Sequence, residues 1–307
     1  MIVASVSNQF FTTLAYNQLF IDISRRIGMD LGGSHFVGGE KTDDMVKQVK
    51  KLNSNGIGAT IDCLGEFVKN EEDTKKYVDN CYKAIHAIRD EKLNAQISLK
   101  LFSVGIEVGQ ETAIRNMNDI LQEAKKYDVF VTINMEEYKN CEGIISAFEA
   151  LREKYDNLGI ALQANLYRTE TDVERLDRFS PAIRFVKGAY IESGDVDINN
   201  KSHVDENYKK LVKSHLLKGN YTQVATHDND MIDFVKKLVN EYDIPKDQFE
   251  FQMLQGMREE KQRELAEDGW NMVVYVPFGK DWYTYFMKRL AERPANIGFT
   301  FMSMARR

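Results

Sequence analysis

Short apolar runs alternate with amphipathic segments from about residue 57 onward. The runs are β-rich and almost continuously apolar, as in strands buried on both faces, and each is followed by a segment with helical spacing. Eight such pairs predict an α/β fold, a (β/α)8 barrel of the TIM type, with a doubly wound open sheet as the alternative. The runs are Gly58–Cys63, Ala95–Leu101, Val129–Met135, Gly159–Ala164, Ile183–Ala189, Thr222–Thr226, Phe249–Leu254 and Met272–Val276.

The chain ahead of the first run has a different pattern. It reads as helical over 10–55 and ends in a Lys- and Asp-rich helix near Asp43–Leu52. With only four prolines and no Ser/Gly-rich stretch, the sequence offers no clear linker between two domains. We therefore predict N-terminal helices over 1–55, followed by one catalytic barrel over 56–307.

Composition narrows the class of protein. Of the 307 residues, 43% are apolar and 29% charged, which permits a large core and excludes a disordered or collagen-like chain. The net charge is −6 and the basic residues are dispersed, so a nucleic-acid partner is not expected. The first cations are Arg25 and Arg26, and no apolar run reaches the roughly 18 residues of a spanning helix. We expect a cytoplasmic protein that is not integral to a membrane.

The cysteines, histidines and glycines match no metal-binding or dinucleotide-binding motif. The three cysteines, Cys63, Cys81 and Cys141, lack metal-ligand spacing, as do the five histidines, so no metal site is predicted. Gly56-Ile57-Gly58 precedes a predicted strand instead of following one, which is the wrong order for a dinucleotide-binding turn. Any nucleotide must therefore be held in another way.

The polar residues at predicted strand ends are the candidates for chemistry, because barrel active sites form at the C-terminal ends of the strands. Lys100 and Lys187 are the sharpest signals, since a buried charge is costly unless it is paired or lies in a site. They could form a Schiff base, as in a barrel aldolase, or ion pairs with Glu66, Glu136 or Glu250, which we favour. The other strand-end residues are Asp62, Asn134, Gln163, Tyr190, Thr226, His227, Gln252, Gln255 and Tyr275.

His227 and one face of a predicted helix each allow two interpretations. His227 could be a base or ligand contact, although a lone histidine is more often a hydrogen-bonded structural residue. In the predicted helix after residue 279, Tyr285, Lys288, Arg289 and Glu292 share one face. That face could be solvated, or its two cations could clamp a carboxylate if the helix covers the barrel mouth. Spacing alone favours the solvated face and does not exclude the clamp.

Longer motifs occur in order along the chain: Phe36-Val-Gly-Gly-Glu40, Thr60-Ile-Asp-Cys-Leu-Gly-Glu66, Ser98-Leu-Lys-Leu101, Gln163-Ala164, Arg184-Phe-Val-Lys-Gly-Ala-Tyr190, Ala225-Thr-His227, Glu250-Phe-Gln-Met-Leu254, Gly256-Met257, Tyr275-Val-Pro-Phe-Gly279 and Tyr285-Phe-Met-Lys-Arg-Leu-Ala-Glu292. Over residues 36–296, through every predicted strand, the chain thereby resembles the monofunctional, FAD-dependent proline dehydrogenase family. The resemblance implies a distorted (β/α)8 barrel with its last helix over the mouth. It also implies oxidation of L-proline to 1-pyrroline-5-carboxylate, with electrons passed to a membrane quinone.

The resemblance assigns roles to individual positions. Residues at flavin-contact positions are Gln163, Arg184, Val186, Lys187, Gly188, Ala189, Thr226, His227 and Gln252. Residues at substrate-pocket positions are Lys100, Asn134, Leu254, Tyr275, Tyr285, Lys288, Arg289 and Glu292. The implied partners are L-proline, the quinone and 1-pyrroline-5-carboxylate dehydrogenase, and the implied location is cytoplasmic, at the inner face of a membrane. No side chain stands out as the general base.

The chain departs from the family pattern at the substrate pocket. Asn134 replaces a usual acidic residue, and Lys288 replaces the first of two usual arginines. Asn165 and Gln255 replace residues that are commonly aromatic. Three hypotheses remain open at this point: an active proline dehydrogenase, a flavin-binding paralogue with weakened or altered substrate use, and a lysine-dependent aldolase.

Overall fold

A computed structural model of the chain describes residues 17, 34–65, 68–190 and 192–292, without the side chains of Ser34 and 289–292. Eight strands pair in parallel, each with its neighbour in the sequence, and β1 pairs with β8 to close a barrel. The predicted (β/α)8 barrel is therefore confirmed, and the open-sheet alternative is wrong. The strands are β1 (Gly58–Cys63), β2 (Ala95–Leu99), β3 (Val131–Ile133), β4 (Leu158–Gln163), β5 (Ile183–Val186), β6 (Thr222–Ala225), β7 (Phe249–Leu254) and β8 (Met272–Phe278).

The predicted strands were most often too long at the C-terminal end. Strand β2 ends at Leu99 and β5 ends at Val186, so Lys100 and Lys187 lie just beyond their strands. Apolar character continues past the last ladder residue because the first loop residues still pack at the barrel rim. The candidate side chains therefore sit where each strand passes into its loop.

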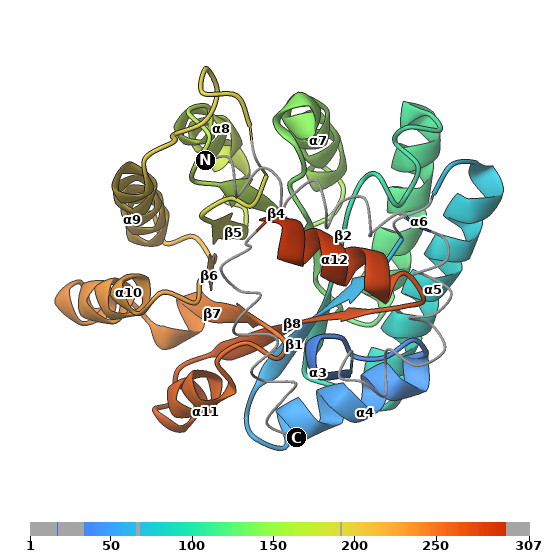
Figure 1. Ribbon diagram of the computed structural model, residues 1–307, viewed down its shortest axis with the longest axis horizontal. Helices are drawn as coiled ribbons and strands as arrows, with labels where there is room; N and C mark the ends of the chain where they lie inside the picture. The colour runs from blue at the N-terminus through green and yellow to red at the C-terminus, as the bar shows by residue number, and fades with distance from the viewer. Residues whose placement is uncertain (1–16, 18–33, 66–67, 191, 293–307) are drawn as a thin grey trace.

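Helices surround the barrel on all sides (Figure 1). Each strand from β1 to β7 is followed by at least one helix, as the alternating pattern predicts. The helices are α3 (Ser34–Phe36), α4 (Thr42–Asn53), α5 (Glu71–Asp90), α6 (Gln110–Lys126), α7 (Tyr138–Arg152), α8 (Thr169–Leu176), α9 (Lys201–Leu217), α10 (Asn229–Glu241), α11 (Glu259–Glu267) and α12 (Trp282–Glu292), with 3-10 turns η2 (Asp177–Phe179) and η3 (Lys246–Gln248).

Helix α4 agrees with the Lys- and Asp-rich helix expected near Asp43–Leu52, and it buries Met45 and Val49 against the barrel. The segment between α3 and α4 is fastened to β8, where the Gly38 amide donates to the Pro277 carbonyl at 2.7 Å. Most of the helical stretch expected over 10–33 lies outside the described residues. The division into a lead-in over 1–55 and a barrel over 56–307 stays a prediction.

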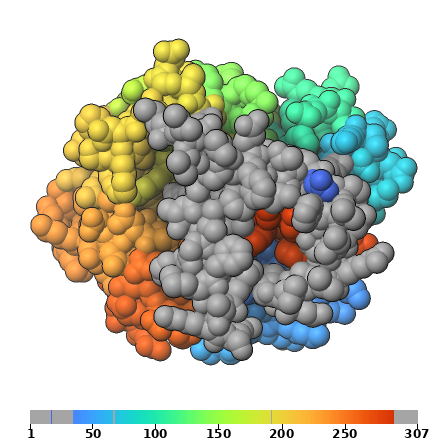
Figure 2. Space-filling view, viewed as in Figure 1, coloured from blue at the N-terminus to red at the C-terminus, as the bar shows by residue number. Residues whose placement is uncertain are grey.

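Helix α12 follows β8 and crosses the face of the barrel in Figure 1, and its atoms are visible near the centre of the same face in Figure 2. Residues that precede the barrel in the sequence hold this helix: Trp282 Nε1 donates to Glu40 at 2.9 Å, and the rings of Phe36 and Phe286 are 5.5 Å apart. These contacts hold the last helix beside the C-terminal ends of the strands, where the substrate clamp was predicted.

The barrel has an apolar outer layer and a polar interior. Large side chains such as Phe148, Phe185 and Phe251 are fully buried. Inside the barrel, Gln96 donates to Glu250 across the lumen at 2.8 Å and accepts from Gln223 at 2.9 Å. Buried polar groups need partners, and these side chains supply one another. The interior is therefore packed with a hydrogen-bonded network below the mouth.

No helix in the described ranges is long and apolar enough to cross a membrane.

His215 on α9 provides a test of the packing between helix and barrel. Its ring is buried, packs edge-on against Phe185 and bonds the Pro181 carbonyl at 3.1 Å, and burial lowers its pKa to about 4. The unfolded chain binds this proton near pH 6.5, so folding stability is lost as the pH falls from about 6.5 towards 4. The loss should reach on the order of 3 kcal/mol.

We predict that His215→Gln, which can still donate to Pro181, flattens this part of the stability profile. Urea unfolding at pH 7.5 and pH 4.5 measures the difference between variant and wild type. His203→Gln, at an exposed histidine on the same helix, is the matched control and should leave the profile unchanged. Identical slopes for wild type and His215→Gln would disprove the assignment.

Candidate active site

Arg184 is the centre of a polar cluster in the barrel. It lies on β5 with 3% of its surface exposed, and its guanidinium bonds to side chains from three other strands or strand ends. Nη1 donates to Ser98 Oγ and Asn134 Oδ1, both at 2.8 Å, and Nη2 donates to Thr60 Oγ1 at 3.2 Å. All three acceptors are neutral. Within the described residues, this buried cation therefore donates to no carboxylate.

Titratable groups near Arg184 offset only part of the effect that burial has on its pKa. Burial lowers the pKa of the Arg184 guanidinium, while Tyr275, Glu250 and Asp62 act in the opposite direction. Arginine stays protonated in proteins, so the site carries a permanent positive charge at this depth. Such a charge can stabilise an anion or a group that becomes negative during a reaction.

Asn134 has a defined orientation because arginine only donates hydrogen bonds. Its Oδ1 must face Arg184, and it also accepts from Ser98 Oγ at 2.8 Å. Its Nδ2 must then face Tyr275, and it donates to the phenolic oxygen at 3.0 Å. Three side chains from different strands or strand ends are thereby locked together.

Tyr275 connects this cluster to α12. It lies half-buried on β8, and the Arg184 guanidinium stands 5.5 Å from its ring centre. Burial raises the pKa of Tyr275 well above its ordinary value; Asp62 and Tyr285 raise it further, while Lys100 and Arg184 act against the rise. The phenol thus stays protonated. Tyr285 is buried on α12, so the helix brings a second phenol to this end of the barrel.

Lys187 forms a second charged cluster and corrects the predicted ion pairs. It bonds Asp228 at 2.7 Å and also pairs with Asp205, two carboxylates that the prediction did not name. Burial alone would raise the pKa of Asp205 and Asp228, but hydrogen bonds from Lys187 help to lower both. The lysine is directed towards the first turns of α9 and α10, which sequence spacing does not reveal.

Two of the expected glutamate partners accept hydrogen bonds from other groups. Glu250 accepts from Gln96 and from Tyr221, each at 2.8 Å, and Gln252 also donates to it. Glu136 accepts from the Phe102 amide at 3.1 Å. Glu66 lies outside the described residues.

His227 is hydrogen-bonded to the backbone of the next strand. Its Nε2 accepts from the Leu254 amide at 3.0 Å, so a neutral ring carries its proton on Nδ1. Arg258 also donates to the His227 carbonyl. These contacts agree with the structural interpretation of this histidine, and they join the ends of β6 and β7. Beside it, Thr226 accepts from the Asp228 amide at 3.1 Å.

The rim after β4 and β5 is closely packed. Gln163 donates to the Glu136 carbonyl at 2.9 Å. Gly188 has φ +113°, and a Cβ at this position would lie 1.9 Å from Asn165 Oδ1, so only glycine fits. Val186 and Ala189 are half-buried on either side of Gly188. The missing side chain of Gly188 therefore lets Asn165 pack directly against the backbone after β5.

Three buried polar atoms near the mouth have no hydrogen-bond partner in the described part of the chain. They are Arg184 Nε, Gln252 Oε1 and Asn165 Oδ1. Buried polar atoms are almost always satisfied, so orphaned donors and acceptors on the strands and strand ends of the barrel are candidates for contacts with a ligand. The set contains one donor and two acceptors.

The structure therefore gathers Lys100, Asn134, Arg184, Tyr275 and Tyr285 into one electrostatically connected group. Leu254 is half-buried and pairs in register with Tyr275 on the neighbouring strand. Lys288 is half-buried on α12. The side chains of Arg289 and Glu292, also on α12, lie outside the described residues, so the arrangement of the full clamp stays a prediction.

Sequence reasoning missed four residues that hold the site. Thr60 and Ser98 accept hydrogen bonds from the Arg184 guanidinium. They were detectable as polar side chains at alternate positions of otherwise apolar strands. Asp205 and Asp228 hold Lys187. Asp228 follows the histidine motif in the sequence, but no local signal marks Asp205 on its helix.

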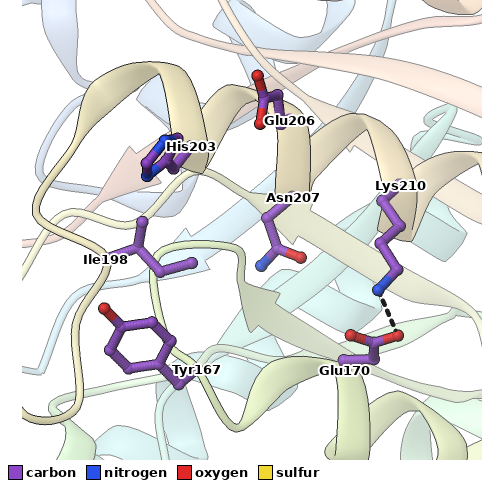
Figure 3. Close-up of a pocket in the computed structure, with 7 residues that line it drawn as sticks. All are labelled: Tyr167, Glu170, Ile198, His203, Glu206, Asn207 and Lys210. Carbon is purple, nitrogen blue, oxygen red and sulfur yellow. Dashed lines mark ion pairs between the residues drawn. The ribbon is translucent and has the colours of Figure 1, made fainter.

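A surface hollow of about 320 Å³ lies apart from this cluster. It opens between the loop after β4 and helix α9, and Tyr167, Ile198, His203 and the Glu170–Lys210 pair line it (Figure 3). None of the site residues named above contributes to its wall. Within the described ranges, no group of three or more His, Cys, Asp or Glu side chains is arranged to hold a metal.

Comparison with known proteins decides the family. Residues 45–301 match the family described as Proline dehydrogenase. Proline dehydrogenase 2 of Bacillus subtilis (strain 168) is 43% identical over 302 residues, covering 98% of this chain and 100% of the relative. Proline dehydrogenase 1 of the same organism is 44% identical, covering 97% and 98%. The chain belongs to the proline dehydrogenase family.

Solved structures agree on the fold of this proline dehydrogenase family member. Proline utilization A (PutA) from Bdellovibrio bacteriovorus has a TM-score of 0.80 at 23% identity, over 94% of this chain. The chain spans only 37% of that PutA chain. At this level of identity, the likeness concerns the barrel architecture alone.

Gly188 supplies a prediction for the rim of the proline dehydrogenase barrel. We expect Gly188→Ala to destabilise the protein by roughly 2–3 kcal/mol, because the new methyl group would collide with Asn165 in a conformation that favours glycine. Gly219→Ala is the matched control: φ is +80° and nothing lies within 4 Å of its Cβ position, so only about 1 kcal/mol should be lost.

The double variant Gly188→Ala with Asn165→Ala removes the colliding atoms and should recover part of the loss. Chemical denaturation of all three variants measures these differences. If Gly188→Ala and Gly219→Ala cost the same, the close approach of Asn165 to Gly188 has no energetic importance.

Proposed function

We propose that this chain oxidises L-proline to 1-pyrroline-5-carboxylate with bound FAD and passes the electrons to a membrane quinone. The observation that carries the proposal is the buried Arg184 cluster beneath α12, in a chain whose family is proline dehydrogenase. The family resemblance supports the quinone, a position at the inner face of a membrane, and transfer of the product to 1-pyrroline-5-carboxylate dehydrogenase.

The residues at the mouth fit a flavin. Its ring edge offers both hydrogen-bond acceptors and an N–H donor, which complement the orphaned Arg184 Nε and Gln252 Oε1. Gln163, Val186, Gly188, Ala189, Thr226 and His227 complete the proposed contacts along the same rim. Lys187 offers a positive charge to the cofactor from its place between Asp205 and Asp228. FAD, when bound, supplies a two-electron acceptor for hydride from the substrate.

Arg184 acts on that chemistry through its charge. A fixed cation in a poorly solvated site stabilises negative charge that develops nearby, and its hydrogen bonds to Ser98, Asn134 and Thr60 prevent it from turning away. The cation is thus preorganised before any reaction. This arrangement supports electron transfer into the bound acceptor.

The proposed substrate site lies between the barrel and α12. Lys288 and Arg289 bind the proline carboxylate, Glu292 helps to orient these cations, and Lys100 adds a further charge beside Tyr275. Leu254 and Tyr275 pack against the pyrrolidine ring, with Tyr285 above them. Orientation supplies much of the rate because no covalent step by the protein is needed.

A flavin-binding paralogue with weakened or altered substrate use is the second candidate. Asn134 places a neutral amide where the family usually has an acid, and it bonds directly to both Arg184 and Tyr275. The aldolase hypothesis has less support, because Lys187 is paired with two carboxylates, and a lysine held in this way lacks the free amine that a Schiff base requires.

Anaerobic mixing with L-proline tests the proposed function. The flavin absorbance should bleach, and 1-pyrroline-5-carboxylate should appear in one-to-one ratio with the flavin reduced. A short-chain quinone should then restore the absorbance. Retention of the oxidised spectrum at saturating L-proline would contradict the dehydrogenase proposal, and borohydride trapping of an adduct on Lys100 or Lys187 would revive the aldolase.

We predict that FAD is bound non-covalently, since the three described cysteines are buried and His227 is engaged with Leu254. Acid precipitation should release the yellow colour to the supernatant. Lys187→Met should weaken FAD binding by roughly tenfold through loss of a charged contact. Lys236→Met, at a surface lysine on α10, serves as the control and should retain full FAD content. Colour that stays with the precipitate would contradict the prediction.

We also predict preference for L-proline over trans-4-hydroxy-L-proline. Tyr275 presents a bulky phenol to the proposed pyrrolidine position, and its oxygen is already engaged by Asn134. An added hydroxyl would need space and a partner, which should reduce kcat/KM by roughly tenfold or more. Steady-state comparison of the two substrates measures the ratio. Equal values would mean that the pocket has a different shape.

A further inference from the structure

Asn134 controls the direction of a hydrogen bond in the proposed substrate site. Arg184 can only donate, so Asn134 Oδ1 faces Arg184 and Nδ2 donates to the Tyr275 oxygen at 3.0 Å. Ser98 strengthens this orientation, because it receives a hydrogen bond from Arg184 and gives one to the same Oδ1. The amide cannot be flipped without placing two donors face to face.

Tyr275 must therefore direct its own hydrogen elsewhere. Its oxygen accepts from Asn134, and none of the described side chains accepts a hydrogen bond from it. Burial raises the pKa of Tyr275 well above its ordinary value, so the hydrogen remains present over the working pH range. The half-buried phenol is an available donor beneath α12.

Among the described side chains, two cations and one carboxylate act on Tyr275. They are Lys100 from the end of β2, Arg184 from β5 and Asp62 on β1. Tyr285 from α12 is a second phenol, and Lys288 lies on the same helix. A positively charged ammonium gains little here, whereas a neutral nitrogen with a lone pair meets a ready donor.

We propose that Asn134 is a positioning residue that makes Tyr275 a hydrogen-bond donor and so selects proline with its ring nitrogen unprotonated. The inference rests on the proposed function and specifies the form of its substrate. The proton of the ammonium is left in the solvent when proline binds. A neutral amine then reaches the oxidation step, which accounts for the lack of a committed base.

Asn134→Asp is the decisive variant because it keeps the shape of the side chain at residue 134 and reverses the direction of its hydrogen bond with Tyr275. A carboxylate accepts from Tyr275, which withdraws the donor, and it adds a negative charge that attracts an ammonium. Tyr275→Phe removes the donor and adds no charge. Asn55→Asp, at an exposed residue of the loop after α4, adds the same charge far from the site and is the matched control.

Anaerobic stopped-flow reduction between pH 6 and pH 9 separates binding from the chemical step. If only the unprotonated amine binds, the dissociation constant of L-proline falls about tenfold per pH unit, because the free amine fraction rises by that factor, while the limiting reduction rate stays constant. Asn134→Asp should show the opposite: a nearly constant dissociation constant and a limiting rate that rises with pH. Tyr275→Phe, which lacks the donor, should weaken the pH dependence of proline binding, whereas Asn55→Asp should keep the wild-type profile.

Binding of two unreactive ligands gives a readout that is independent of turnover. Tetrahydrofuran-2-carboxylate carries a ring oxygen that can only accept, and cyclopentanecarboxylate carries a methylene in the same place. Calorimetry should show wild type and Asn55→Asp preferring the ether by roughly three- to tenfold. Asn134→Asp and Tyr275→Phe should each lose this preference.

The inference is overturned if the wild-type dissociation constant is independent of pH, if Asn134→Asp keeps the wild-type profile, or if both variants retain the ether preference. Failure of the proposed function gives a different result. In that case L-proline does not bleach the flavin at any pH, while the ether preference and its loss in the two variants still report the direction of the Tyr275 hydrogen bond.

Discussion

The hydrogen bonds of the buried Arg184 guanidinium constrain the interior of this barrel. An arginine this deep needs oxygen acceptors at fixed positions, because an unsatisfied buried cation is far more costly than any single packing defect. Thr60, Ser98 and Asn134 supply them from three different strands or strand ends. Polar side chains therefore occupy places that aliphatic residues usually fill in such barrels, and the mouth inherits a permanent positive charge.

The two cationic centres at the mouth differ in how they are compensated. Arg184 is surrounded by neutral oxygens, whereas Lys187 lies between two carboxylates. The field of the first centre extends into the site, while that of the second is largely cancelled by its partners. We infer that Arg184 tunes the electronics of a bound flavin and that Lys187 mainly positions it. Asn134 belongs to the first centre, because its bond with Arg184 fixes the direction of its hydrogen bond with Tyr275.

Much of the fold could be predicted from local pattern, and much less of the site. Eight apolar runs of suitable length were enough for the closed barrel, and β1 and β7 match their predicted bounds. Lys100 and Tyr275 were recognisable because charged or phenolic groups at strand ends are unusual, whereas Arg184 was assigned only through the family resemblance. The partners of Lys187 were predicted wrongly, because Asp205 comes from a helix and its approach depends on tertiary packing. The orientation of Asn134 depends on a contact with Arg184, which is 50 residues away in the sequence.

The reduction potential of the bound flavin in Arg184→Gln tests the central claim most directly. Glutamine can still donate to Ser98 and Asn134 but carries no charge, so the reduced, more negative flavin loses its stabilisation. The account predicts a midpoint potential lowered by at least roughly 30 mV, equivalent to about 1.4 kcal/mol for two electrons. Lys187→Gln, whose cation is already balanced by two carboxylates, should shift the potential much less. An unchanged or raised potential in Arg184→Gln, in protein that retains its FAD, would contradict the account.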